Sequence, residues 1–283
     1  MIEPATNATP TVEKPAAEKA APPAAASPAP VKSMRIGIVP FLNAQPLLWG
    51  LKEHHQLFPV PPSSMGLLLK EGRLDVALAP IVAQFLNPAL QIIPVAAIGC
   101  KGPIKSVRIL SHCPLPQVEK LFVDSRSQTS VYLARLILKK WFGVKKLVVK
   151  PVEMENFHPN QTKPWEATLQ FGDNALIAAP TGMTVTDLGE EWFRNTQKPF
   201  VFAVWMARNV PIAREMETEL LNARNEGVKH FEETVKNYKG IWVFDHPKSK
   251  EYLEKNVSYE YMKDEVKGQL EFQRLLKEEG LIL

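Results

Sequence analysis

Two short segments carry side chains that could bind or act on a small molecule. Residues 124–130 read Asp-Ser-Arg-Ser-Gln-Thr-Ser and join a predicted strand to a predicted helix. Hydroxyls and free backbone amides at a helix N-terminus bind anions, so this segment is a candidate anion site. Asn43 follows another predicted strand, and its amide can donate and accept hydrogen bonds at once. Each segment also has a simpler interpretation, in which Ser127 or Thr129, and likewise Asn43, merely caps a helix.

Other common catalytic and metal-binding patterns do not occur. The six histidines form no HxxxH or HExxH pair, so a metal site is not expected. No GxSxG, GxxxxGKS or GxGxxG is present, which removes the usual hydrolase, P-loop and Rossmann signals. The only cysteines, Cys100 and Cys113, are too few for a disulfide framework and lack CxxC spacing.

The composition restricts the class of protein. A chain of 283 residues with 45% hydrophobic and 23% charged content is expected to form one large globular domain or two smaller ones. A net charge of +4, with no basic run longer than a pair, offers little to a nucleic acid backbone. The apolar stretches fall far short of the ~20 residues of a membrane span. We therefore expect a cytoplasmic enzyme or binding protein with a small-molecule partner, and neither nucleic acid nor membrane as a partner.

The first 33 residues differ from the rest of the chain. They contain seven prolines and ten alanines but no aromatic residue. Such a segment cannot bury enough apolar area to offset its conformational entropy, so residues 1–33 are expected to be a disordered tail. Prolines and charges interrupt its apolar stretches, which is unlike a secretory signal. Folded structure is expected from Met34 onward.

The elements that would position the candidate residues alternate along the chain. Strands are predicted at residues 35–39, 75–79, 92–99, 106–111, 121–123, 146–149, 175–178 and 200–207. Helices are predicted at residues 44–55, 63–72, 81–86, 129–142, 165–171, 185–196, 212–238, 248–255 and 263–279. Asn43 is the predicted cap of the first of these helices, and Ser63 or Ser64 that of the second. The alternation favours an α/β fold with parallel sheets.

The order of these elements predicts two lobes. A middle lobe of residues 108–203 inserted into a discontinuous lobe of residues 34–107 plus 204–283 accounts for it. Clefts between domains are common ligand sites, so a ligand is expected between the lobes.

Six segments together resemble a known family. They are residues 35–46, 99–107, 127–130, 172–176, 187–192 and 199–205, of which Leu-Gly-Glu-Glu-Trp and Pro-Phe-Val-Phe-Ala-Val-Trp in the last two are the most specific. The family is chorismate dehydratase, the first enzyme of the futalosine route to menaquinone. The resemblance extends from Met34 essentially to the C-terminus. It implies a two-lobed fold similar to the type II periplasmic binding proteins and a cytoplasmic lyase without a metal or organic cofactor. That lyase converts chorismate to 3-[(1-carboxyvinyl)oxy]benzoate and water.

This reaction suggests roles for particular residues. Asn43 and Ser106 are the candidate catalytic residues, with Asn43 orienting the departing hydroxyl. Thr129 and Ser130, together with helix amides and Ser106, would hold the substrate carboxylates. Gly172 and Asp173 complete the candidate substrate-binding set, although Gly-Asp is also a common turn pair.

The family-like segments offer few groups that could accept a proton. Asp187, Glu190 and Glu191 are expected to be structural or solvated. We therefore hypothesise that the enolpyruvyl carboxylate of the substrate takes the proton. The chain also departs from the family in one loop: relatives commonly place a serine pair after the strand at 75–79, whereas this chain has Pro80 and Ile81, so a hydroxyl contact to substrate is missing there.

Two alternatives stay open. The same lobes without chemistry would form a solute-binding protein for a small carboxylate, although such proteins have no need of the segment at 187–192. The sister enzyme that makes 1,4-dihydroxy-6-naphthoate shares the fold and uses a histidine, but its first loop is unlike residues 40–46. Incubation with chorismate would separate a dehydratase from a binder.

Overall fold

The computed structural model describes residues 1, 32–154, 157–178, 181–240 and 246–283. Residues 32–283 form one compact unit, and both sheets belong to it. The expectation that residues 1–33 form a disordered tail falls almost wholly outside the described residues.

The first of two five-stranded sheets has the strand order β2-β1-β3-β10-β4. Its strands are β1 (Arg35–Ile38), β2 (Gln56–Pro59), β3 (Val76–Pro80), β4 (Gln91–Cys100) and β10 (Phe200–Ala207). Strand β1 runs parallel to β2 and β3, but β10 is antiparallel to both β3 and β4, so the expectation of a purely parallel sheet is wrong. The reason lies in the chain path. The chain leaves the first sheet after Cys100 and returns to it at Phe200, which pairs with Cys100, so β10 runs back along β4 in the opposite direction.

The second sheet has the order β7-β6-β8-β5-β9. Its strands are β5 (Val107–Ser111), β6 (Lys120–Asp124), β7 (Val148–Val152), β8 (Glu166–Phe171) and β9 (Thr184–Asp187). Strand β6 is parallel to β7 and β8, whereas β5 is antiparallel to β8 and β9, so this sheet is mixed as well. The strands of the first sheet come from residues 35–100 and 200–207, and those of the second from residues 107–187.

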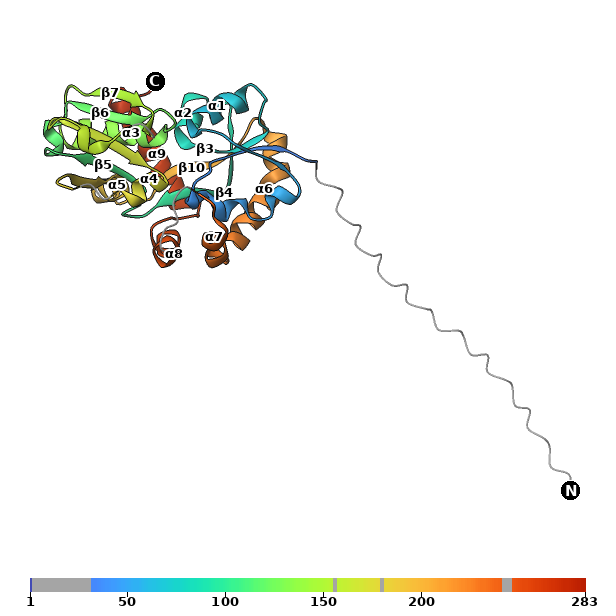
Figure 1. Ribbon diagram of the computed structural model, residues 1–283. Coiled ribbons are helices and arrows are strands. Elements are labelled where there is room, and N and C mark those ends of the chain that lie inside the picture. The colour runs from blue at the N-terminus through green and yellow to red at the C-terminus, as the bar shows by residue number, and fades with distance from the viewer. Residues whose placement is uncertain (2–31, 155–156, 179–180, 241–245) are drawn as a thin grey trace. The chain divides into compact units, whose positions relative to one another are not determined.

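Helices pack around both sheets (Figure 1). Among the described residues they are the 3-10 helices η1 (Leu42–Leu48), η2 (Leu51–Glu53), η3 (Leu115–Gln117) and η6 (Pro159–Gln161), the π-helix η4 (Ile137–Trp141), and α1 (Pro62–Lys70), α2 (Ile81–Leu86), α3 (Thr129–Leu136), α4 (Asp173–Ile177), α5 (Leu188–Thr196), α6 (Val210–Gly227), α7 (Phe231–Asn237), α8 (His246–Lys255) and α9 (Lys263–Glu278).

The segment around residues 165–178 contradicts the sequence-based prediction. The predicted helix at 165–171 is strand β8, and the predicted strand at 175–178 is part of helix α4. Strand β8 is central in its sheet and buried along nearly all its length, so pairing with β5 and β6 decides its conformation. Gly172, with φ of 66°, then turns the chain into a helix whose short apolar run resembles a buried strand.

Several predicted helix starts and ends are also wrong. The helix predicted at 44–55 consists of η1 and η2, and Asn43 lies inside η1, whose N-cap is Phe41. Pro61 and Gln128, rather than the predicted Ser or Thr residues, stand at the N-caps of α1 and α3. The helix predicted at 185–196 begins as strand β9, the one at 212–238 is divided into α6 and α7, and the strand predicted at 146–149 lies at 148–152.

One of the two most specific family-like segments, residues 187–192, has a structural role. Asp187 caps α5 by accepting hydrogen bonds from the Gly189 and Glu190 amides. Its carboxylate also accepts hydrogen bonds from the amides of residues 104 and 105, which lie in the segment connecting β4 of the first sheet to β5 of the second. A Cβ on Gly189 would lie 2.6 Å from the carbonyl oxygen of Gly102, so glycine permits this close approach. The indole N–H of Trp192, which is fully buried, donates to the Pro199 carbonyl at 3.2 Å. These contacts hold the segment that connects β4 to β5 against the second sheet.

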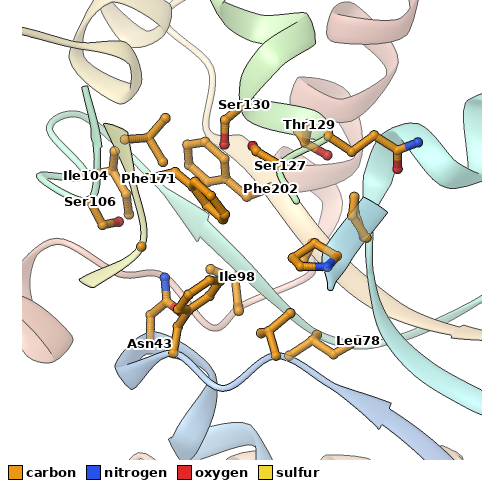
Figure 2. Close-up of a pocket in the computed structure, with 18 residues that line it drawn as sticks. Asn43, Leu78, Ile98, Ile104, Ser106, Ser127, Thr129, Ser130, Phe171 and Phe202 are labelled. Atoms are coloured by element: carbon orange, nitrogen blue, oxygen red, sulfur yellow. The ribbon is translucent and has the colours of Figure 1, made fainter. Parts of the chain in front are cut away.

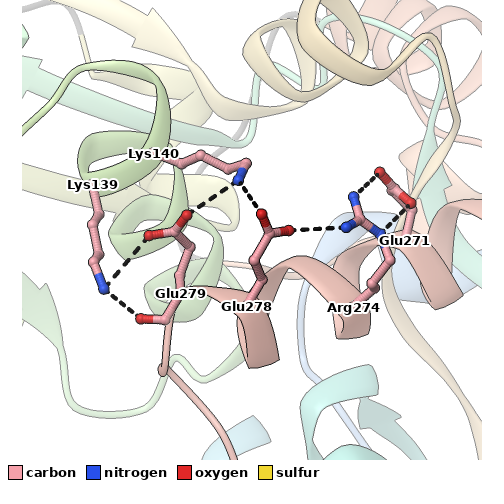
Figure 3. Close-up of polar contacts among 6 residues, drawn as sticks. All are labelled: Lys139, Lys140, Glu271, Arg274, Glu278 and Glu279. Carbon is pink, nitrogen blue, oxygen red and sulfur yellow. Dashed lines mark hydrogen bonds and ion pairs between the residues drawn. The ribbon is translucent and has the colours of Figure 1, made fainter.

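The C-terminal helix α9 is joined to π-helix η4 by a network of ion pairs (Figure 3). Lys140 contacts Glu278 at 3.2 Å and Glu279 at 3.1 Å, and Arg274 extends the network by pairing with Glu278 at 2.9 Å. Isolated surface ion pairs contribute at most about 1 kcal/mol, but several that share partners hold one geometry better. Helix α9 also carries Phe272, which packs edge-on against Trp192, so the network supports the same junction.

Candidate active site

A pocket of about 570 Å³ lies between loops of the first sheet and loops of the second (Figure 2). The apolar walls include Leu78 and Ile98 from the first sheet, Phe202 from β10 and Phe171 from the end of β8. A planar apolar ring would be excluded from water by these walls.

The polar lining of the pocket contains most of the residues predicted from the sequence. Asn43, Ser106, Thr129, Ser130 and Gly172 all line it, together with Ser127 and Gln128. Pro80 lines it too and presents an apolar ring, with no hydroxyl, to the pocket. Of the predicted set, Asp173 alone is absent from the lining.

The start of helix α3 supplies a buried oxygen without a partner. Neither Ser127 nor Thr129 caps this helix, so the simple capping interpretation of residues 124–130 is wrong. Among the described residues, the Thr129 hydroxyl has no hydrogen-bond partner although Thr129 is buried. Buried polar atoms are nearly always paired, so this hydroxyl is available to a ligand or to water in the pocket.

Asn43 belongs to a hydrogen-bonded group of three side chains. Its Nδ2 donates to the Tyr252 hydroxyl at 3.1 Å, and that hydroxyl donates to Ser106 Oγ at 2.8 Å. Asn43 Oδ1 is buried and has no partner among the described residues. Burial raises the pKa of Tyr252, which keeps the phenol protonated. Sequence reasoning missed Tyr252, because the pattern at 248–255 predicts a helix and nothing about its chemistry.

Asp173 connects the two sides of the pocket behind its lining. Its carboxylate accepts the Leu42 amide N–H at 3.2 Å and the Tyr238 hydroxyl. Leu42 lies in η1 and Tyr238 follows α7, whereas Asp173 begins α4 after the second sheet's β8. Next to it, Gly172 leaves room for the Phe41 ring, which a Cβ would approach to 3.0 Å.

The electrostatic character of the pocket is unusual for a site that would take an anion. Among the described residues that line it, none is acidic, basic or a histidine. Hydroxyls, amides and backbone N–H groups therefore carry the polar contacts. Within the described part of the chain, no group of three or more His, Cys, Asp or Glu residues could hold a metal ion.

Comparison with known proteins places the chain in a family. A family model described as menaquinone biosynthesis matches residues 34–278. The chain belongs to this family. Among its curated relatives is the chorismate dehydratase of Thermus thermophilus, 26% identical over 222 residues, which are 71% of this chain and 79% of that protein.

Solved structures confirm the fold expected for a member of the menaquinone biosynthesis family. A protein from Archaeoglobus fulgidus superposes with a TM-score of 0.73 at 12% identity, over 88% of this chain and 98% of that one. The periplasmic aliphatic sulphonate binding protein of Escherichia coli gives a TM-score of 0.60 at 17% identity, over 89% and 88%. The predicted two-lobed α/β fold of the periplasmic-binding-protein type is therefore confirmed.

In the described residues, no helix is both long and apolar enough to cross a membrane.

The carboxyl group of Asp173 should make stability depend on pH. Burial raises its pKa above the usual 3.8, so the folded state holds the proton more tightly than the unfolded state. The stability from this group is fully present below about pH 4 and is lost as the pH rises through the raised value. Asp173→Asn cannot titrate, so the melting temperature of the wild type relative to this variant should fall from pH 4 to pH 8. A difference that stays constant over this range would contradict the raised pKa.

Proposed function

We propose that the protein is a chorismate dehydratase of the futalosine route to menaquinone. It is a carbon–oxygen lyase that converts chorismate to 3-[(1-carboxyvinyl)oxy]benzoate and water. The observation that carries this proposal is the unpartnered Asn43 Oδ1 in an otherwise largely apolar pocket, in a member of the menaquinone biosynthesis family. The chorismate dehydratase among its relatives supports the choice of substrate.

The reaction removes the C3 proton and the C4 hydroxyl of chorismate. Loss of water makes the ring aromatic, which supplies the driving force, so the protein has mainly to position the substrate. Asn43 Oδ1 would accept a hydrogen bond from the C4 hydroxyl, which keeps its proton, and would orient that group for departure. Ser106, Thr129 and Ser130 would hold the carboxylates, while Phe171 and Phe202 enclose the ring.

The proton at C3 needs an acceptor. None of the described residues lining the pocket is a carboxylate, a lysine or a histidine. The enolpyruvyl carboxylate of chorismate is then the base: the C3–H electron pair becomes part of the new ring double bond as the C4–O bond breaks. The proton passes to the departing oxygen, which leaves as water.

We place this reaction in the cytoplasm. Cys100 and Cys113 are free thiols, as is usual in a reducing compartment. We also keep, as part of the proposal, the division into a lobe of residues 34–107 plus 204–283 and a lobe of residues 108–203, with one adjustment: strand β10 belongs as a whole to the first lobe, because it pairs with β3 and β4.

Incubation of the purified protein with chorismate tests the function. We expect stoichiometric loss of chorismate and formation of an aromatic product with the mass of chorismate less one water. The resemblance to binding proteins makes a solute-binding protein the second candidate. A stable chorismate complex without turnover would support that candidate and refute the dehydratase. The sister synthase is disfavoured because no histidine is among the described residues that line the pocket.

Removal of the Thr129 or Ser130 hydroxyl should weaken substrate binding more than turnover. A hydrogen bond to a charged group contributes about 1.5–3 kcal/mol, so KM should rise roughly ten- to a hundredfold in Thr129→Val or Ser130→Ala. Thr168→Val is the matched control, since the Thr168 hydroxyl is equally buried and unpartnered but does not line the pocket. Steady-state kinetics check both. An unchanged KM with lowered stability would make Thr129 a structural residue.

A further inference from the structure

Tyr252 connects two pocket residues that come from distant segments. It lies on α8 and is 4% exposed, and its hydroxyl contacts Asn43 of η1 and Ser106, which precedes β5. We propose that Tyr252 is a positioning residue that fixes the hydrogen-bond polarity of the pocket, so that Asn43 presents an acceptor and Ser106 a donor. This inference rests on the proposed function. It adds which hydrogen-bonding groups the substrate must present: a donor to Asn43 and an acceptor to Ser106.

The polarity follows from counting protons. A phenol has one proton to donate and can accept hydrogen bonds through its oxygen. Because Asn43 Nδ2 is a donor at 3.1 Å, the Tyr252 oxygen accepts there, and its own proton goes to Ser106 Oγ at 2.8 Å. Ser106 Oγ has then accepted a bond and retains its own proton. No described residue accepts that proton, so it is available to a ligand in the pocket.

Asn43 lies at the other end of the hydrogen-bonded chain Asn43–Tyr252–Ser106, which we call the relay. Its orientation is fixed in the same way. With Nδ2 bonded to Tyr252, the amide plane of Asn43 is held and its Oδ1 remains as the free atom, buried and without a described partner. The phenol keeps its proton because burial raises the pKa of Tyr252, so the direction of the relay does not reverse on titration. One acceptor and one donor thus stand at set places in the pocket.

A ligand that satisfies both must bring a hydroxyl to Asn43 and a carboxylate or ether oxygen to Ser106. Chorismate has its C4 hydroxyl for the first and carboxylate and ether oxygens for the second. The aromatic product has lost that hydroxyl, so in its complex Asn43 Oδ1 stays unpaired. An unpaired buried acceptor is unfavourable, and the relay therefore favours substrate over product.

The test compares two buried tyrosines. Tyr252→Phe removes the relay and keeps the ring. Tyr259→Phe is the matched control, because the Tyr259 hydroxyl is equally buried, has no described partner and does not line the pocket. We expect Tyr252→Phe to fold and to lose roughly ten- to a hundredfold in kcat with a smaller change in KM. Its preference for chorismate over added product, measured as the ratio of product inhibition constant to KM, should also fall. Tyr259→Phe should leave all three unchanged.

A readout that does not need turnover separates this inference from the proposed function. In the ligand-free protein labelled with 15N, the side-chain amide signals of Asn43, assigned by their loss in Asn43→Asp, should move in Tyr252→Phe and stay in place in Tyr259→Phe. A wild type that does not consume chorismate would refute the dehydratase while leaving this measurement valid. Unmoved Asn43 signals, or kcat within twofold of the wild type in Tyr252→Phe, would overturn the relay.

Discussion

Asn43→Leu is expected to fold and to lose chorismate turnover by roughly two to four orders of magnitude. Leucine is close in size to asparagine but has no acceptor for the C4 hydroxyl and no donor for Tyr252. Because Asn43 lies inside η1 and does not cap it, no capping hydrogen bond is lost. The rate of aromatic product formation and the melting temperature measure the two effects separately.

Asn43→Asp separates the acceptor function of the Asn43 side chain from its donor function. Its carboxylate keeps one acceptor oxygen toward the pocket but can no longer donate to Tyr252, so part of the activity should remain. Chorismate should still bind to Asn43→Leu through Thr129 and Ser130, which isothermal titration can show. Near-normal turnover in a folded Asn43→Leu protein would remove Asn43 from the mechanism.

Gly227→Ala is expected to cause the largest loss of stability. Gly227 is buried at the end of α6, and a Cβ there would lie 1.8 Å from the carbonyl oxygen of Pro46 in η1. Backbone atoms cannot rotate out of the way as a side chain can, so η1 or α6 must shift. We expect a loss of about 3 kcal/mol, which lowers the melting temperature by roughly 6–12 °C. Turnover should fall as well, because η1 carries Asn43.

Asn222→Ala provides the control on the same helix. Asn222 is exposed on α6, and alanine is the better helix former, so stability should be unchanged or slightly higher. Thermal unfolding and turnover of both variants make the comparison. If Gly227→Ala melted with the wild type, the close approach of α6 to η1 would not be a constraint on the fold.

Local sequence predicted those elements whose own residues decide their conformation. Strand β10 at 200–207, helix α2 at 81–86 and the helix at 248–255 lie where they were expected within two residues, because each has a clear run of β-branched, apolar or helix-forming residues. The prediction for residues 165–178 was wrong, because an apolar run of that length fits either a strand or a buried helix. The pairing of β8 between β5 and β6 decides between the two.

The family, the two-lobed fold and most of the pocket lining could be predicted from the amino-acid sequence, since six of its segments, above all those at 187–192 and 199–205, resemble a known family. How those residues work together depends on tertiary contacts. Tyr252 lies 209 positions from Asn43 and 146 from Ser106, and no periodicity connects side chains so far apart. The contacts of Asp173, which was predicted only as a substrate-binding residue, were equally beyond local reasoning, because its partners come from η1 and from the end of α7. Hydrogen bonds between distant segments depend on how the sheets and helices pack, and that packing leaves no pattern in the neighbouring residues.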